Sequence, residues 1–380
     1  MPFFSKLTAF FSHISQSIRT FFAKVKAKLL PSQNVQMDSK EKTNISVSLY
    51  AMPAHNGDAL MLEFTDEQGK ERRIWIDGGL GKSYLEYGQQ KMLALWEAGK
   101  QIDLMVISHI DADHIGGIVS FVRDRAMNKE LVQEFWFNNP AKKDTQERSI
   151  DQGLELLDYL EFSKKWQDDP VVAGHVYDFF GAKLAIVSPN EAGLTALAWE
   201  YEEELAHRGM ENEKSDYEAS VNSLIKNKEI EDEAVANFTS IAFIFEWKGK
   251  KTLMLGDAHP SVVVEGLEEF GYSAKQRLKL DAVKLSHHGS KRSISSELIA
   301  MLDCDTWIIS TDASRHGLPN KEALARILTH PSRNWKKRYT FIFNYDNKKL
   351  RSIFTKWEMK EYFFQCVFPQ KGKLGVRLDV

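Results

Sequence analysis

Four side chains that can bind a metal ion stand close together in the chain. They are His109, Asp111, Asp113 and His114, and they directly follow the apolar segment 104–107. Imidazole nitrogens and carboxylate oxygens bind divalent metals, and a rigid turn can direct them to one point. A turn that only caps the next helix, with Asp113 as the N-cap, needs fewer such residues. The spacing therefore favours a metal site.

Two further apolar segments end in residues of the same kind. Residues 253–255 lead to Asp257, and residues 282–285 lead to His287 and His288. A Gly-Asp turn alone is weak evidence because such turns are common, whereas paired histidines at the end of a strand are unusual. The three segments together are best explained by a binuclear metal site.

The elements that must position these residues alternate between strands and helices. Strands are predicted over 46–50, 59–64, 73–76, 104–107, 183–187, 240–247, 252–255, 282–285 and 307–310, and helices over 91–97 and 116–122. The strand 73–76 runs into the turn Asp77-Gly78-Gly79. Three early strands with tight turns favour an α/β fold with a mixed sheet over a helical bundle.

The motifs resemble those of the metallo-β-lactamase fold hydrolases. The segment from His109 to His114 is similar to their H-x-H-x-D-H signature, with Asp111 in place of the second histidine. This variant, together with the HHGS string at 287–290, resembles the hydrolase domain of ComEC-type competence DNA-uptake proteins and their stand-alone relatives. The resemblance extends over 45–327 and includes Gly57-Asp58-Ala59, the turn at 76–79, Asn237 with Ser240, and the loop 310–319. It implies an αββα sandwich of two mixed sheets flanked by helices.

The resemblance also implies a set of metal ligands. These are His109 and Asp111 for one ion, Asp113 and His114 for the other, Asp257 as the bridge, and one or both of His287 and His288. Many relatives carry a further histidine at the strand that ends before Pro189, and this chain has none there. Relatives also carry a histidine before the proline of the late loop; here that position is Leu318, with His316 two residues earlier. Carboxylates beside imidazoles suit manganese as well as zinc, so two divalent ions of either kind are expected.

A phosphodiester substrate would assign further roles. Two bound ions would lower the pKa of a bridging water from about 15.7 toward 7. The expected residues are Asp113 or Asp257 to orient that water, His288 or His316 to stabilise the transition state or protonate the leaving group, and Lys291 and Arg292 to contact phosphate. Lys291 and Arg292 are equally typical of a solvated helix start. Asp58 and Asp77 are expected to support ligands or turns.

The charge of the chain is balanced overall but uneven along its length. With 50 Lys and Arg against 53 Asp and Glu, the net charge of -3 predicts no general attraction to nucleic acid or membrane. Residues 191–236 are strongly acidic and are expected to form a helical insertion, whereas 321–380 are strongly basic. The two cysteines, Cys304 and Cys366, exclude a disulfide framework and favour the reducing cytoplasm.

The two ends of the chain carry separate predictions. Apolar residues at helical spacing with basic neighbours predict an amphipathic basic helix over 1–30, followed by a linker over 31–44 and a hydrolase domain over 45–330. The helix could dock on a protein partner, the protein itself or an anionic membrane surface, so the cytoplasmic location includes a peripheral position at the membrane. No oligomeric state is indicated.

The C-terminal segment 331–380 mixes aromatic and basic residues. Examples are Trp335 and Trp357 beside Lys336 and Lys356. Such mixtures bind single-stranded nucleic acid by stacking and charge. The alternative is a β-hairpin of 340–343 with 350–354 that packs its rings on the sheet.

Three functions are compatible with these observations. The leading hypothesis is a metal-dependent hydrolase, specifically a phosphodiesterase or nuclease that uses metal-activated water. The second is a hydrolase of an ester, thioester or lactam bond, which needs no basic groove. The third is a metal-binding module that acts with a protein partner in bacterial defence.

Overall fold

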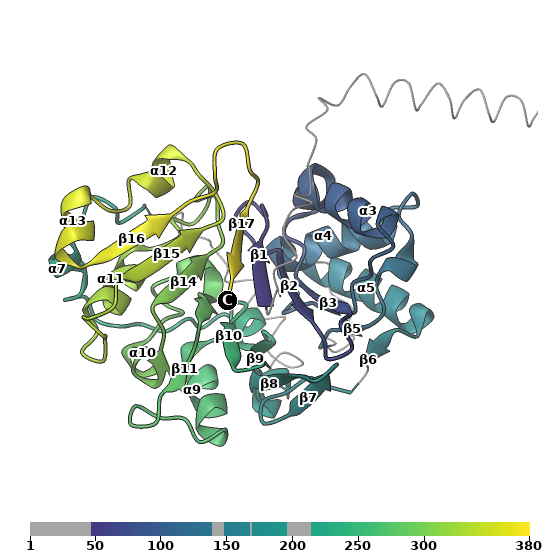
Figure 1. Cartoon of the computed structure of the whole chain (residues 1–380), viewed down its shortest axis with the longest axis horizontal. Coiled ribbons are helices and arrows are strands. Elements are labelled where there is room, and N and C mark those ends of the chain that lie inside the picture. The colour runs from purple at the N-terminus through teal and green to yellow at the C-terminus, as the bar shows by residue number, and fades with distance from the viewer. Residues whose placement is uncertain (1–46, 139–147, 168, 196–213) are drawn as a thin grey trace, which may run out of the picture. The chain divides into compact units, whose positions relative to one another are not determined.

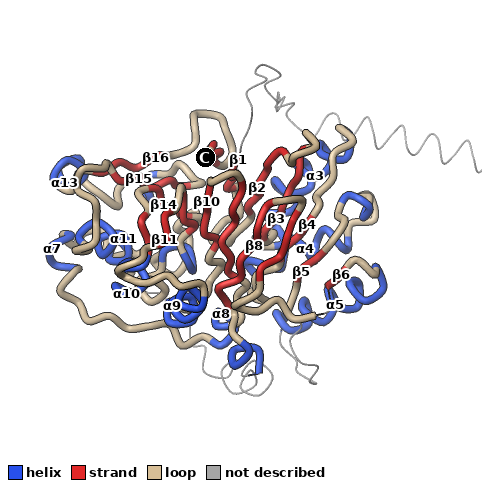
Figure 2. The backbone as a smooth tube through the Cα atoms, turned by 60° about the horizontal axis from the view of Figure 1, so that its bottom comes forward, coloured by secondary structure: helices blue, strands red, loops and turns tan. Residues whose placement is uncertain are grey.

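The strands from residue 47 onward assemble into two mixed β-sheets that face each other (Figures 1 and 2). The computed structural model describes residues 47–138, 148–167, 169–195 and 214–380. The predicted helix over 1–30 and the linker over 31–44 lie outside these residues. No helix in the described ranges is long and apolar enough to cross a membrane.

The first sheet has seven strands. In spatial order they are β17 (Val376–Asp379), β1 (Val47–Ala51), β2 (Leu60–Thr65), β3 (Glu71–Ile76), β4 (Leu104–Val106), β5 (Phe135–Trp136) and β6 (Trp166–Gln167). Strands β17 to β3 pair antiparallel, and β3 to β6 pair parallel. Both faces of the sheet are covered, so β2 is apolar at successive positions. Leu62 and Phe64 lie in the core between the sheets, and Met61 lies in the core under the helices.

The second sheet has eight strands. In spatial order they are β16 (Phe364–Val367), β15 (Tyr339–Phe343), β14 (Thr306–Ile309), β12 (Ala282–Lys284), β10 (Lys250–Met254), β9 (Ala242–Trp247), β8 (Ala182–Ser188) and β7 (Val176–Phe179). Strands β16 to β10 run parallel, and β9, β8 and β7 continue antiparallel. A separate parallel pair joins β11 (Leu278–Lys279) and β13 (Leu302–Asp303).

Helices cover the outer faces of both sheets. On the side of the first sheet are α2 (Gly81–Ser83), the π-helix η1 (Tyr84–Gly88), α3 (Gln89–Glu97), α4 (Ala112–Arg123), η2 (Lys129–Leu131) and α5 (Arg148–Ser163). On the side of the second sheet are α7 (Val221–Leu224), α9 (Pro260–Glu269), α10 (Ser296–Met301), α11 (Lys321–Thr329), α12 (Lys348–Arg351) and α13 (Lys356–Glu361). The short helix α8 (Val235–Phe238) and the 3-10 turn η3 (Ser286–Gly289) lie in connections. The predicted αββα sandwich is therefore confirmed.

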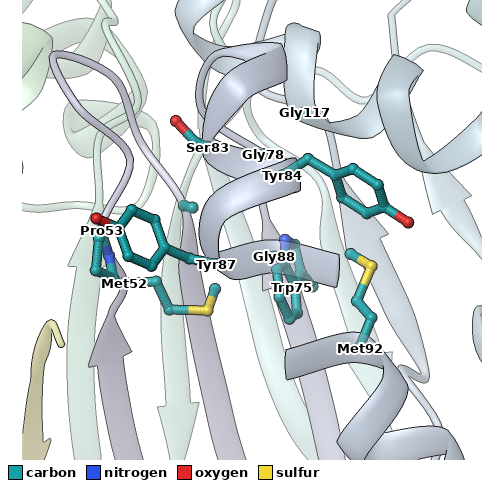
Figure 3. A pocket seen from close by; sticks show the side chains of 11 residues that line it. Met52, Pro53, Trp75, Gly78, Ser83, Tyr84, Tyr87, Gly88, Met92 and Gly117 are labelled. Carbon is teal, nitrogen blue, oxygen red and sulfur yellow. The ribbon is translucent and has the colours of Figure 1, made fainter. Parts of the chain in front are cut away.

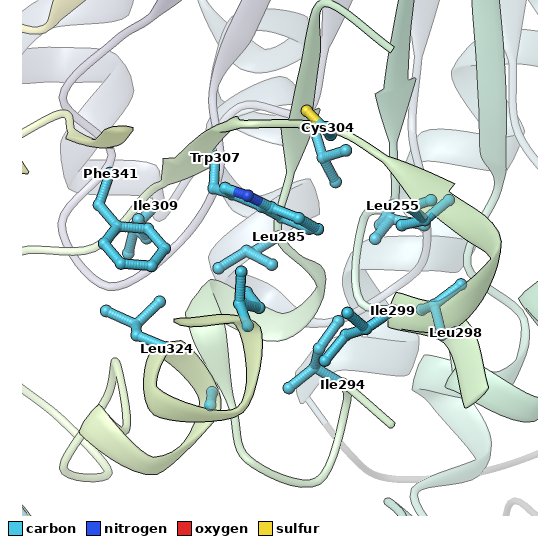
Figure 4. Packing of buried hydrophobic residues seen from close by; sticks show 14 of the residues in the cluster. Leu255, Leu285, Ile294, Leu298, Ile299, Cys304, Trp307, Ile309, Leu324 and Phe341 are labelled. Carbon is cyan, nitrogen blue, oxygen red and sulfur yellow. The ribbon is translucent and has the colours of Figure 1, made fainter. Parts of the chain in front are cut away.

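The outer core of the second sheet shows why its strands are apolar throughout. Trp307 of β14 is 1% exposed and lies among Leu285, Ile309 and Leu324 (Figure 4). Burying a large apolar side chain contributes about 1.5–3 kcal/mol. This packing makes the end of each strand a rigid platform for the residue that follows it.

The parallel pairing brings the chemically active residues to one edge of each sheet. Asp77 and His109 follow β3 and β4, which are neighbours in the first sheet. Asp257 and His287 follow β10 and β12, which are neighbours in the second sheet. Because parallel neighbours end at the same edge, each pair is delivered to one place. The ends of these four predicted strands are the reason the site forms where it does.

A glycine allows the loop after β1 to reach the same edge. A Cβ atom on Gly57 would lie 1.8 Å from the carbonyl oxygen of Asp113, which no side chain permits. The next residue, Asp58, donates its N–H to that carbonyl at 3.2 Å. The Gly-Asp-Ala motif thus has a steric reason, namely the close approach of this loop to α4.

The C-terminal segment differs from the predicted hairpin. Residues 348–351 form α12 instead of the start of a second strand, because the side chain of Asn347 caps the helix by accepting the N–H of Leu350. Strand β15 pairs in parallel with β14 and β16, while β17 pairs with β1. Residues 331–380 are therefore built into both sheets and do not extend a domain that ends at 330.

The acidic segment 191–236 is fixed to the body over its described part. Residues 196–213 lie outside the described ranges, and within 214–236 the helical residues are those of α7 and the first two of α8. The carboxylate of Asp216 accepts the backbone N–H groups of Lys321 and Glu322, both at 2.8 Å, at the start of α11. Val221 is buried in the outer core. The segment thus packs on the fold and is less helical there than predicted.

Candidate metal centre

The loop between β4 and α4 places the first group of predicted ligands. His109 is 2% exposed, and Asp113 and His114 lie in the first turn of α4. Asp111, not Asp113, occupies the N-cap position, and its side chain makes no capping hydrogen bond. Helix capping therefore does not explain the two carboxylates.

Four imidazole rings surround the carboxylate of Asp257, which is 2% exposed. The distances from its Oδ2 to the Nε2 atoms are 3.3 Å for His114, 3.6 Å for His288, 3.9 Å for His287 and 4.0 Å for His109. The rings come from two loops that are about 170 residues apart in sequence. Asp257 is therefore the centre of the cluster.

The outer nitrogens of two of these rings have acceptors. Nδ1 of His114 lies 2.8 Å from Oδ2 of Asp77, and Nδ1 of His288 lies 3.0 Å from the carbonyl oxygen of Ser310. A carboxylate or carbonyl can only accept, so Nδ1 carries the hydrogen in both rings. The Nε2 lone pairs then point toward Asp257 and are available to a metal ion.

The turn η3 holds its two histidines in an unusual backbone conformation. His287 has φ 45° and ψ 52°, and His288 has φ 54° and ψ 21°. Non-glycine residues in this left-handed region cost about 1–3 kcal/mol each, so such positions are maintained where a site needs them. The conformation turns both rings toward Asp257, from which their Nε2 atoms are less than 4 Å away.

The remaining two carboxylates lie at the edges of the cluster. Oδ2 of Asp113 is 3.4 Å from Nε2 of His288 and accepts a hydrogen bond from Nδ2 of Asn56 at 2.8 Å. Oδ2 of Asp111 is 3.7 Å from Nε2 of His109. Their side chains are about one fifth exposed. Together with His287, whose side chain is 30% exposed, they are the members of the cluster that solvent or a substrate can reach.

Asp58 is also close to the cluster, but it lies on the outer side. Asp58, His114, Asp257 and His288 each offer a ligand atom, and these atoms lie within 4.8 Å of one another. However, Oδ2 of Asp58 binds Nζ of the buried Lys284, and its Oδ1 faces Nδ1 of His288, 3.3 Å away, on the side opposite Nε2. This geometry is that of a supporting residue.

The electrostatics of the centre favour a positive charge within it. Burial is the largest single effect and lowers the pKa of His288, but the nearby carboxylates, Asp257 foremost, together outweigh it and raise this pKa to about 9. The pKa of His114 is raised for the same reason, and that of Asp257 lies well below its usual value despite burial. Protons on the imidazoles and a divalent cation are alternative sources of this charge.

Two buried atoms test whether a metal ion fits. Within the described ranges, Nε2 of His109 and Oδ1 of Asp257 are buried without a hydrogen-bond partner. Buried polar atoms without partners are costly and uncommon. A divalent ion would satisfy both atoms, and the donor set of imidazoles and carboxylates suits such an ion. The cluster is therefore suited to bind divalent metal ions.

The other predicted site residues lie on loops around the cluster. His316 is half-buried in the loop after β14; burial lowers its pKa, and the charge of Asp113 partly opposes this effect. Lys291 is half-buried and Arg292 is exposed just after η3. Their roles as phosphate contacts remain predictions.

Sequence reasoning missed two charged residues next to the cluster. Asp232 accepts from Nδ1 of His287 at 3.0 Å, and Lys284 pairs with Asp58. Asp232 belongs to a run of acidic residues, and nothing in the sequence distinguishes it from the acidic residues beside it. Lys284 lies within a predicted apolar strand. A charged residue in such a strand indicates a buried partner of opposite charge.

An apolar pocket lies apart from the cluster. It is lined by Met52, Trp75, Tyr84, Tyr87 and Met92 among others, and it lies beside α2 and η1 (Figure 3). None of the side chains around Asp257 lines it. It is a feature of the helix packing and not part of the candidate centre.

Comparisons with known proteins agree with this architecture. The family profile described as metallo-beta-lactamase superfamily matches residues 52–203. The ComE operon protein 3 of Bacillus subtilis (strain 168) is 20% identical over 291 residues, which are 73% of this chain and 30% of that protein. The chain thus spans less than a third of the length of this curated relative.

Two solved structures are also similar. The metallo-beta-lactamase fold protein YhfI from Bacillus subtilis is 9% identical and matches 87% of this chain and 98% of its own, with a TM-score of 0.39. A diphosphatase from the PhnP family is 14% identical and matches 88% of this chain and 98% of its own, with a TM-score of 0.36.

The matched profile and the two sheets with helices on both outer faces together define the fold. The chain has the fold of the metallo-β-lactamase superfamily. Its cluster of histidines and aspartates lies where the strands of both sheets end.

Proposed function

We propose that this protein is a metal-dependent phosphodiesterase of the ComEC-like kind, acting on nucleic acid. The observation that carries the proposal is the convergence of four Nε2 atoms within 4.0 Å of Oδ2 of Asp257. The HHGS motif and the similarity to ComE operon protein 3 support the ComEC-like assignment.

The geometry suggests how two ions would be held. One would take His109 and Asp111, the other would take Asp113, His114 and His288, and Asp257 would lie between them. His288 joins the ligands here because its Nε2 is close to both Asp113 and His114, at 3.4 Å from each. Bound zinc or manganese ions would provide a hydrolytic nucleophile from water at neutral pH and would neutralise phosphate charge.

The chain's own residues supply the remaining chemistry. Asp113 is held by Asn56 and is partly exposed, so it can orient a water molecule and accept its proton. His316 has a lowered pKa and is neutral at pH 7, which suits a hydrogen bond to a phosphate oxygen better than donation of a proton. Lys291 and Arg292 would contact the phosphate backbone.

The aromatic residues of the segment 331–380 support nucleic-acid binding less than the sequence suggested. Tyr339, Phe341 and Phe354 are buried in the core. Trp335 is 51% exposed, but it precedes β15, whereas the metal centre lies where the parallel strands end. Trp335 therefore lies toward the edge of the sheet opposite the metal centre. A protein or membrane partner for residues 1–30 remains a prediction.

The experiment compares wild-type protein with the Asp257→Asn variant. Hydrolysis of bis-p-nitrophenyl phosphate is measured first, followed by labelled single- and double-stranded DNA and RNA, each with manganese, magnesium or zinc. We expect metal-dependent cleavage that the variant lacks, while Glu265→Gln, an exposed change on α9, keeps it. Bound metal without phosphodiester cleavage would instead indicate an ester, thioester or lactam substrate.

A further inference from the structure

The two halves of the centre differ in their number of nearby donors. Asp113, His114 and His288 surround one side of Asp257, with Nε2 of His288 3.4 Å from both of the other residues. The other side has His109 with Asp111. The strand β8, which ends at Ser188, brings no histidine to this side. One half therefore has fewer nearby protein donors than the other.

His287 is the one histidine around Asp257 that is not assigned to either half of the centre. Its Nε2 lies 3.9 Å from Oδ2 of Asp257, and its side chain is 30% exposed. Its Nδ1 lies 3.0 Å from Oδ2 of Asp232, so this nitrogen carries the hydrogen and Nε2 is left as a donor to metal. The ring is thus oriented toward Asp257 from outside by a carboxylate.

Asp232 is itself held in place from two directions. Its Oδ2 accepts a hydrogen bond from Nδ2 of Asn237 at 2.7 Å, and its backbone N–H donates to the carbonyl of Arg292 at 3.1 Å. Its side chain is 11% exposed.

The acidic segment around Asp232 is also anchored. Glu229 accepts the backbone N–H of Ser296 at 3.0 Å at the start of α10. Nδ2 of Asn227 donates to Glu322 on α11 at 2.8 Å. These contacts fix the chain just before Asp232 to two helices of the body. The position of Asp232 is therefore determined by the fold.

We infer that Asp232 of the acidic segment orients His287 as a further metal ligand beside Asp257. The inference rests on the proposed metal centre. It makes the acidic segment a part of metal binding. Asp232 acts through His287 and is a positioning residue.

The test is the number and affinity of metal ions, independent of hydrolysis. Metal-free full-length protein is titrated with Zn²⁺ against a chelating dye, and bound metal is counted by mass spectrometry. We expect two equivalents for wild-type protein. In Asp232→Ala, one equivalent should bind about 10- to 100-fold more weakly while the other is unchanged, the usual cost of losing a residue that orients a ligand.

Two further variants keep the test decisive. Asp232→Asn retains an oxygen acceptor and should recover part of the lost affinity, whereas a general loss of structure would not be recovered. Glu233→Gln, an exposed neighbour in the same segment, should bind both equivalents as wild type does. Absorption of bound Co²⁺ then reports whether the coordination of one ion has changed.

The possible failures are distinguishable. Two equivalents with wild-type affinity in Asp232→Ala would overturn the role of Asp232 and leave the proposed function standing. Wild-type protein that binds no metal would overturn the proposed function and this inference with it.

Discussion

The carboxylate of Asp77 lies 2.8 Å from Nδ1 of His114, and neither side chain is exposed. Asp77 also accepts the backbone N–H of Ser108 at 2.8 Å and its hydroxyl at 2.7 Å. Both acceptor atoms of Asp77 are thus used to fix the loop that carries His109 and His114. The turn after β3 therefore determines the direction of a histidine that follows β4.

The Asp77→Asn substitution should weaken metal binding without changing any ligand. An amide can donate where the carboxylate accepts, so the His114 ring loses its fixed tautomer. We expect an affinity lower by about 10- to 100-fold, measured by titration against a chelating dye. Asp103→Asn is the control, because Asp103 is also buried in the first sheet but pairs with Arg72. Equal affinities in the two variants would contradict the role of Asp77.

The stability of the metal-free protein should depend on pH through His288. The folded pKa of about 9 exceeds the usual 6.5, since Asp257, Asp113 and Asp58 together outweigh the opposing effect of burial. The folded state therefore binds more protons, and this stabilisation is complete below about pH 6.5 and lost as the pH rises to 9. Metal ions compete with the same protons, so metal affinity should rise over this range.

Thermal unfolding of metal-free protein between pH 6 and pH 9.5 measures this dependence. Asp257→Asn removes the foremost of the charges that raise the pKa of His288 and should flatten the curve. A wild-type melting temperature that stays constant or rises between pH 6.5 and 9 would contradict the assignment.

The sequence was sufficient to bring together the histidines and aspartates of the cluster but not the residues that support them. His109 to His114 are contiguous and follow an apolar strand, and Asp257 and His287 follow two more, so the rule that parallel strands end at one edge brings them together. Asp232 reaches His287 across 55 residues and Asp58 reaches Lys284 across 226. Such pairs depend on tertiary packing that no local pattern reports.

The pair of Lys284 and Asp58 should be important for stability. Lys284 is fully buried in β12, and its Nζ binds Oδ2 of Asp58. Lys284→Met leaves a buried carboxylate without its partner, which costs about 3–5 kcal/mol. Lys251→Met, at the partly exposed pair with Glu246, should cost about 0–1 kcal/mol. Urea unfolding of both variants checks the difference, and similar losses would contradict it.

The C-terminal segment shows where a pattern is ambiguous. Alternating apolar residues predicted β15 correctly, but the pattern does not state which strand is its neighbour. Two apolar runs joined by a short polar stretch suggested a hairpin. The cap at Asn347 begins a helix instead, and β16 becomes the parallel neighbour of β15. Local sequence preference thus predicts the strand, whereas long-range packing determines which strand pairs with it.

Two aromatic residues of this segment should respond differently to substitution. Phe341 in β15 has no exposed surface and contacts the rings of Phe354 and Phe364. Phe341→Ala should therefore cost about 3–5 kcal/mol of unfolding free energy. Trp357 is 66% exposed, so Trp357→Ala should stay within about 0.5 kcal/mol. Chemical denaturation measures both, and a destabilising Trp357→Ala would show that its ring packs on the protein.

The central claim is that the residues around Asp257 form a metal centre that hydrolyses phosphodiesters. The most direct measurement combines metal content by mass spectrometry with hydrolysis of bis-p-nitrophenyl phosphate for wild type and Asp113→Ala, which keeps the buried carboxylate of Asp257. We predict bound divalent metal and metal-dependent turnover in wild type, with turnover lost and the fold retained in the variant. Equal turnover in both proteins, or wild-type protein that neither binds metal nor turns over substrate, would contradict the claim.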